Sequence, residues 1–263
     1  MRRALLALIV VAPFLYMVAT AITAGPEALT ALPFGRFLLT SAIVAVAVVI
    51  GQVITSATAA YAFARLRFAG RDRLFLCYLW ALTVPAILLV LPRFLLIDSI
   101  GWSEGYRGLI STELVSVTGI FLLRQFFRTL PRDVEDAARL EGAGEWTIFW
   151  RVVVPQVRPA LATLAVLAFA DQWRSFLWPL VVAQSGAPVV VEVGMANLRG
   201  AYALSGPDQL AVAALAVVPV AVLCVVAQTH LVRGLASPLL PPRGGSEAQL
   251  PGDVSSIAAP DPL

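Results

Sequence analysis

Acidic and small residues gather in one polar stretch of a chain that is 59% hydrophobic. Five carboxylates occur within the thirteen positions of residues 133–145. The short side chains of Ala137 and Ala138 would let a second backbone approach closely. Because so polar a stretch must lie in water, we interpret it as a contact site for another protein.

The same stretch carries the signals of a short helix. Asp133 and the acidic residues after it place negative charge at the first turn, where free N–H groups point outward. Ala137 and Ala138 are strong helix formers. Gly142 and Gly144 can adopt a positive φ and stop the helix. The sequence therefore predicts a compact helix with a charged rim and a sharp exit.

A second group of chemically active side chains lies within an apolar segment. Asp171 and Arg174 are three residues apart, which places them on neighbouring positions of one helix face. An ionisable pair inside a membrane is a candidate functional site, and it can equally be an ion pair that only neutralises itself. With Gln172, Trp173 and Trp178 nearby, the pair could line a pathway for a sugar-like solute.

Several classes of site are excluded or disfavoured. All 19 basic residues are arginine, so the chain lacks the lysine of a phosphate-binding P-loop, and any ATPase must be another chain. Cys77 and Cys224 fall in apolar segments, where they act as small hydrophobic residues and have no metal-ligand spacing. The net charge of +3 does not indicate nucleic acid, since the charges flank apolar runs. We predict no catalytic residue and no metal site.

The elements that position these residues are apolar helices. A mean hydropathy of +0.85 with 13% charged residues indicates an integral membrane protein. A spanning helix needs about 20 residues. We predict an all-α membrane protein with six transmembrane helices, at residues 4–24, 38–64, 74–97, 108–127, 160–183 and 209–232.

Two of these helices need comment. The third contains Pro85 and Pro92, and we expect one kinked span. The first could be a cleaved signal peptide, but its apolar run exceeds the usual core of such a signal, so we expect it to be retained.

Arginine placement predicts the orientation. With the N-terminus inside, 14 of the 19 arginines lie on the cytoplasmic side and 5 elsewhere, a clear positive-inside bias. Both termini and the polar loop, residues 130–159 between the fourth and fifth helices, are then cytoplasmic. Residues 236–263 are rich in Pro, Gly and Ser and are predicted to be a disordered tail.

The polar loop resembles that of a known family. The matching residues, at the family's spacing, are Asp136, Ala137, Ala138, Gly142, Val152, Val154 and Pro155. In this pattern the chain resembles the permease subunits of bacterial binding-protein-dependent ABC importers, in the carbohydrate-uptake branch typified by the second maltose-type subunit. Asp136 stands where the family usually has Glu, and Arg174-Ser175 where an Asn-Glu pair is common. Further likeness extends over residues 37–235.

The resemblance implies a permease domain over residues 1–235 whose loop couples transport to an ATPase. The residues expected to make this coupling contact are Asp136, Ala137, Ala138, Arg139, Leu140, Glu141, Gly142 and Pro155. The expected partners are a homologous second permease subunit, a cytoplasmic ATPase dimer that binds ATP and Mg, an extracytoplasmic solute-binding protein and membrane lipid. The solute would be a sugar, a polyol or a glycerophosphate-like compound. No C-terminal contact with the ATPase is carried over, because the family's usual ending is replaced here.

Two alternatives from other classes stay open at this point. The chain could be a secondary transporter driven by an ion gradient, with Asp171 and Arg174 as its relay. It could also be a membrane scaffold without transport. The coupling motif disfavours both.

Overall fold

The computed structural model describes residues 33–197 and 206–236, together with residues 12, 16 and 19. Every regular element in these ranges is helical, which confirms the all-α class. The predicted first helix and the tail after residue 236 lie almost entirely outside the described residues. Two described helices are long and apolar enough to cross a membrane alone, and up to five spans result if each bent pair of helices counts as one.

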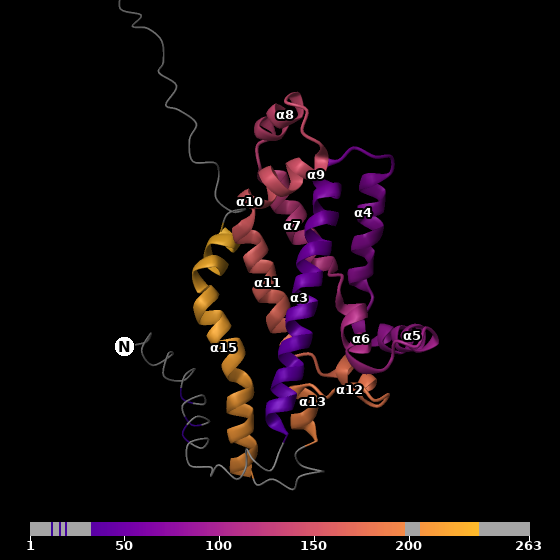
Figure 1. Ribbon diagram of the computed structural model, residues 1–263, viewed down its shortest axis with the longest axis vertical. Helices are drawn as coiled ribbons and strands as arrows, with labels where there is room; N and C mark the ends of the chain where they lie inside the picture. Colours follow the sequence, from indigo (N-terminus) through magenta and orange to yellow (C-terminus); the bar gives the residue numbers. More distant parts are fainter. Residues whose placement is uncertain (1–11, 13–15, 17–18, 20–32, 198–205, 237–263) are drawn as a thin grey trace, which may run out of the picture.

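The central element is α3 (Phe34–Arg65), which runs the length of the bundle in Figure 1 and confirms the expected helix at 38–64. It packs against α7 (Val117–Thr129) and α11 (Arg158–Trp173). Small buried side chains such as Ala57 and Ala60 allow this close approach. On its far side α11 packs against α15 (Gly206–Ala236), which covers the expected helix at 209–232.

The segment at 74–97, expected as one kinked helix, is two helices. They are α4 (Arg71–Trp80), followed by a 3-10 turn η1 (Ala81–Thr83), and α5 (Ala86–Ser99). The two are bent by 104°, and α5 points sideways in Figure 1. The cause is Pro85, which lacks an N–H and holds the preceding Val84 extended, at ψ 119°. The two helices together are long and apolar enough to count as one span, and the expected interruption at Pro85 is a break between two helices.

The segment at 108–127 is also broken. It comprises α6 (Gly105–Ile110), η2 (Ser111–Glu113) and α7, bent by 43°. Backbone carbonyls freed by the break receive hydrogen bonds from α3: Gln52 Nε2 donates to the Glu113 carbonyl and Thr55 Oγ1 to the Leu114 carbonyl, both at 2.8 Å. Ser116 then caps α7 by accepting from the Gly119 N–H. Side chains of α3 thus stabilise a break that apolar surroundings would otherwise penalise.

The segment expected as one span at 160–183 is divided as well. After α11 ends at Trp173, residues 174–176 are not helical, and α12 (Leu177–Ala183) begins a separate helix. The following α13 (Val191–Ala196) lies near the start of α3, where its first backbone N–H donates to Ser41 Oγ at 2.8 Å.

The polar loop forms one end of the bundle, at the top of Figure 1, where α3 and α7 also finish. There α8 (Asp133–Leu140) is followed by a composite segment, residues 145–156, that we call the elbow. The elbow consists of α9 (Glu145–Thr147), the π-helix η3 (Ile148–Val153) and α10 (Val154–Gln156). It meets α11 at 79°.

The elbow is fixed to the bundle by an apolar cluster. Ile148, Phe149 and Val153 are fully buried against α3 and α7. The ring of Phe149 lies 5.1 Å from that of Tyr61 on α3, and Tyr61 meets Phe127 of α7 edge to face at 6.1 Å. The polar loop therefore sits on a rigid base.

Candidate functional site

The helix α8 ends by the glycine stop that its sequence predicts. Gly142 has φ +84°, in the left-handed region. Its N–H donates to the Arg139 carbonyl at 3.0 Å, and the Ala143 N–H donates to the Ala138 carbonyl at 3.0 Å. This pair of bonds is the Schellman motif, which satisfies the last carbonyls of the helix. Gly144, the second glycine expected to take a positive φ, has φ −70°.

A buried ion pair joins α8 to the end of α3. The side chain of Glu135 is only 2% exposed, and its Oε1 lies 3.0 Å from Nε of the equally buried Arg65. Arg65 also donates from Nη2 to the Leu130 carbonyl at 2.9 Å. Burial raises the pKa of the Glu135 carboxyl, and the neighbouring guanidinium groups only partly offset this shift. Such a pair contributes orientation more than stability.

Arg139 extends the network across three elements. It contacts Asp136 of its own helix at 2.8 Å and Glu145 of α9 at 2.9 Å, and it lies 3.6 Å from Glu135. Glu145 also accepts a hydrogen bond from the Tyr61 hydroxyl of α3 at 2.7 Å. The carboxylate of Glu145 raises the pKa of Arg139. The network therefore holds α8, the elbow and α3 in one arrangement.

The opposite face of α8 is open to solvent. Leu140 is 91% exposed, and Val134, Asp136 and Ala137 are exposed beside it, followed by Glu141. An apolar strip with an acidic rim, on a helix anchored at its rear, is suited to docking on another protein. The predicted contact residues from Asp136 to Glu141 largely share this exposed surface.

Pro155, the last predicted coupling residue, lies in α10 at the end of the elbow. It stands just before the 79° bend into α11, so the elbow links the glycine stop of α8 to that helix. A π-helix such as η3 is rare and frequently marks a functional site.

The predicted pathway residues do not form one lining. Trp173 is buried, and its Nε1 donates to the Ala216 carbonyl of α15 at 2.9 Å. Trp178 is buried in a different cluster, where Nε1 donates to the Gly108 carbonyl of α6 at 3.2 Å. Gln172 is also largely buried. The two indole rings are therefore core residues that join helices.

Asp171 and Arg174 do lie together. They form an ion pair at 3.9 Å, with side chains 91% and 71% exposed in this single chain. Asp171 occupies the last turn of α11 and Arg174 follows its end, so the pair lies at a helix terminus and not at mid-helix as expected. Only this part of the predicted lining is open to a partner or a solute.

The sequence alone did not reveal the partners within two ion pairs, Arg65 with Glu135 and Arg93 with Glu113. Arg65 and Glu135 are 70 positions apart, and Glu135 lies among acidic residues that all looked solvent-facing. Arg93 forms an ion pair with Glu113, and its guanidinium lies 4.3 Å from the Trp178 ring centre. The charge of Arg93 inside an apolar segment was the one available signal, but it did not reveal the partner. Among the described residues, no cluster of three or more His, Cys, Asp or Glu could hold a metal ion.

Residues 53–236, which include α8 and the elbow, match the family described as the binding-protein-dependent transport system inner membrane component. The chain belongs to this family. It is a permease subunit of an ABC importer, as the loop motif predicts, and nothing in the family favours an ion-gradient-driven transporter. Because it is an inner membrane component with apolar helices, a multi-pass membrane protein is confirmed.

Individual permeases support this assignment. The chain is 33% identical over 208 residues to the sn-glycerol-3-phosphate transport system permease protein UgpE of Yersinia pestis bv. Antiqua (strain Antiqua), covering 77% of this chain and 73% of the relative. It is 32% identical over 192 residues to the arabinooligosaccharides transport system permease protein AraQ of Halalkalibacterium halodurans, covering 73% and 69%. Both relatives are transport permeases, and the resemblance to the carbohydrate-uptake branch is confirmed.

A solved structure shares the fold. A chain in the crystal structure of a bacterial ABC transporter involved in the import of the acidic polysaccharide alginate superposes with a TM-score of 0.74. The match covers 86% of this chain and 92% of the other, at 21% sequence identity. The permease fold is therefore established independently of the loop motif.

Proposed function

We propose that this permease couples the passage of a sugar or related solute to ATP hydrolysis through α8. The observation that carries the proposal is the two-sided character of that helix. One face exposes Leu140 and its apolar and acidic neighbours, while Glu135 on the other face is held against Arg65 of α3. A cytoplasmic ATPase subunit that grips the exposed face would move α8 without bending it.

The rest of the loop is built to pass a movement of α8 through the elbow to α11. The Schellman stop at Gly142 and the bonds of Arg139 to Glu145 fix α8 on the elbow. The buried face of the elbow is packed against α3 and α7, and its far end leads into α11. When ATP closes the ATPase dimer, α8 and the elbow move as one body and open the pathway outward.

The assembly that we infer has four kinds of component. The six membrane spans of this chain, with both termini in the cytoplasm, pair with a homologous second permease subunit. A separate ATPase dimer binds ATP and Mg, and an extracytoplasmic binding protein delivers the solute. Relatives named for sn-glycerol 3-phosphate and arabinooligosaccharides support a sugar, polyol or glycerophosphate-like solute. Asp171 and Arg174 are the candidates to face it.

Replacing Ala137 with Arg tests the docking face. The side chain is exposed on α8, so the substitution should leave folding intact and block close approach of an ATPase subunit. In proteoliposomes that hold the assembled importer and its binding protein, we expect uptake to fall at least about 30-fold with normal membrane insertion. Arg151→Ala, exposed on the elbow, is the matched control and should transport normally. Wild-type uptake by the Ala137→Arg importer would exclude α8 as the docking element.

A further inference from the structure

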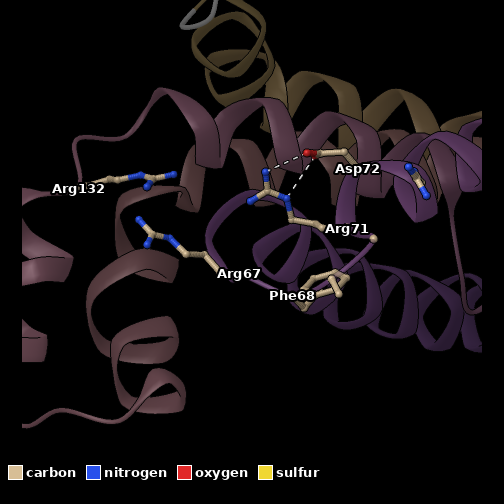
Figure 2. Close-up of a pocket in the computed structure, with 8 residues that line it drawn as sticks. Arg67, Phe68, Arg71, Asp72 and Arg132 are labelled. Carbon is tan, nitrogen blue, oxygen red and sulfur yellow. Dashed lines mark hydrogen bonds and ion pairs between the residues drawn. The ribbon is translucent and has the colours of Figure 1, made fainter.

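A basic cleft lies beside α8, at the end of the bundle where α3 turns into α4. Its volume is about 890 Å³. The residues that line it are Arg67, Phe68, Ala69, Gly70, Arg71, Asp72, Arg73 and Arg132. Figure 2 shows Arg67 and Arg132 extending from different segments toward the same opening, with Arg71 and Asp72 joined beside it. Four arginines and one carboxylate thus surround a single opening.

The cleft carries an excess of positive charge that the described part of the chain does not neutralise. A second cavity of about 530 Å³ shares Arg71, Asp72 and Arg132 with the first and adds three more arginines, Arg65, Arg124 and Arg128. The single carboxylate is already used twice, because Asp72 pairs with Arg71 at 3.3 Å and with Arg124 at 3.5 Å. Like charges this close repel unless an anion lies among them.

Of the other arginines of the two cavities, Arg65 is paired with Glu135, and four have guanidinium groups that make no such pair. No ion pair with a described residue is made by Arg67, Arg73, Arg128 or Arg132, all of which are exposed. Guanidinium presents a planar fork of donors that fits phosphate oxygens in pairs. The N-terminus of α4 opens on the same cleft at Gly70 and adds a partial positive charge. The chemistry that fits is a phosphate group.

The apolar surface next to the cleft indicates the source of that phosphate. Leu74, Leu76 and Trp80, which follow the basic residues along α4, are exposed large apolar side chains. Phe68 is exposed at the mouth itself. A free phosphate or an acidic protein surface would leave these apolar side chains exposed, whereas the acyl chains of a lipid would cover them. Basic pockets at the cytoplasmic ends of membrane helices are typical sites for anionic headgroups.

We propose that this cleft binds the phosphodiester headgroup of an anionic phospholipid, whose acyl chains lie along the exposed side of α4. The bound lipid bridges Arg67, after α3, and Arg132, before α8. It therefore fastens the base of α8 to the membrane surface. This site is separate from the proposed ATPase contact, because none of its residues belongs to the exposed face of α8.

Lipid binding by the full-length protein in detergent tests the proposal. Native mass spectrometry gives the apparent affinities for phosphatidylglycerol and for phosphatidylcholine with the same acyl chains. We expect clear selectivity for phosphatidylglycerol. The double variant Arg67→Gln/Arg132→Gln should weaken phosphatidylglycerol binding about 30-fold, since each arginine near an anionic headgroup strengthens binding about 5-fold. Arg67→Lys/Arg132→Lys should retain most of the binding.

The matched control is Arg151→Gln/Arg158→Gln, which removes two exposed arginines at the same end of the bundle but outside the cleft. It should keep the wild-type affinity. An equal loss in both double variants would mean general charge attraction and would overturn the site. Unchanged binding in the Arg67/Arg132 variant would show that the lipid binds elsewhere and would overturn the site. Displacement of phosphatidylglycerol by millimolar inorganic phosphate would make it a free-phosphate site instead.

Discussion

Glu135 connects α8 to the end of α3 through its ion pair with Arg65. Its carboxylate faces Arg65 at 3.0 Å inside the protein, while the motif residue Asp136 beside it points outward and pairs with Arg139. Neighbouring acidic residues therefore have different roles. We expect the buried one to orient α8 and the exposed one to shape the surface offered to a partner.

The raised pKa of Glu135 predicts an unusual stability profile. A carboxyl whose pKa is higher in the folded state than its unfolded value of about 4.3 contributes stability below that value and loses it as pH rises through the folded pKa. Glu135→Gln mimics the neutral form. At about pH 8 the variant should melt at or above the wild-type temperature, and the gap should close as pH falls through the folded pKa toward the unfolded value of about 4.3.

The measurement is the melting temperature of the wild type and of Glu135→Gln in detergent across this pH range. Glu141→Gln is the control for removing one exposed acidic residue. A wild-type advantage that is largest at high pH would mean that the ion pair outweighs the cost of burial. Transport by the Glu135→Gln importer should fall even where its melting temperature does not, because the orienting charge is lost.

A second prediction at single residues concerns the exposed ion pair of Asp171 and Arg174. Its side chains are too exposed in the single chain for a core role, and the second permease subunit or the solute is what could cover them. We expect Asp171→Asn to change uptake kinetics without changing the amount of assembled importer. Both are measurable in one preparation, with Glu104→Gln, an acidic-to-amide change elsewhere, as control. Unchanged kinetics would make the pair structural.

Among the elements, the polar loop joins the short helix α8 to the packed elbow through the glycine at its C-terminal end. Gly142 permits this join, since a left-handed φ of +84° is costly for other residues. Ile148, Phe149 and Val153 are buried and hold the elbow against the bundle, so we expect the elbow to move together with α8.

Gly142→Pro should therefore uncouple the importer. Proline cannot adopt φ +84° and also removes the N–H that bonds the Arg139 carbonyl. We expect normal insertion and continued ATP hydrolysis with little uptake. Gly144→Ala is the matched control, because its φ of −70° suits any residue, and it should transport normally. A Gly142→Pro importer with the wild-type ratio of solute to ATP would show that the stop is dispensable.

At the scale of the whole molecule, α3 and α15 were predictable because an unbroken apolar run of more than 20 residues specifies a spanning helix by itself. The breaks were not. Pro85 was visible, but the sharpness of the bend was not, and the break after η2 depends on hydrogen bonds from Gln52 and Thr55. These partners lie about 60 positions away in the sequence.

In the candidate site, too, some features follow from the local sequence and others depend on distant residues. The helix, its glycine stop and its exposed acidic rim follow from local residue types, so the sequence was sufficient for α8. The burial of Glu135 and the packing of Trp173 and Trp178 depend on residues of distant helices, such as Arg65 and Ala216. Periodicity within one segment carries no information about such neighbours.

Docking of an ATPase subunit on α8 can be measured directly with a photo-cross-linking residue placed at Leu140 in the assembled importer. Leu140 is 91% exposed at the centre of the proposed docking face. A cross-linker at Trp80, exposed on the proposed lipid-facing side of α4, serves as the control. With the cross-linker at Leu140 we predict a covalent product that contains this chain and the ATPase. With the cross-linker at Trp80 we predict no such product. Absence of an ATPase product at Leu140, in an importer that still transports, would contradict it.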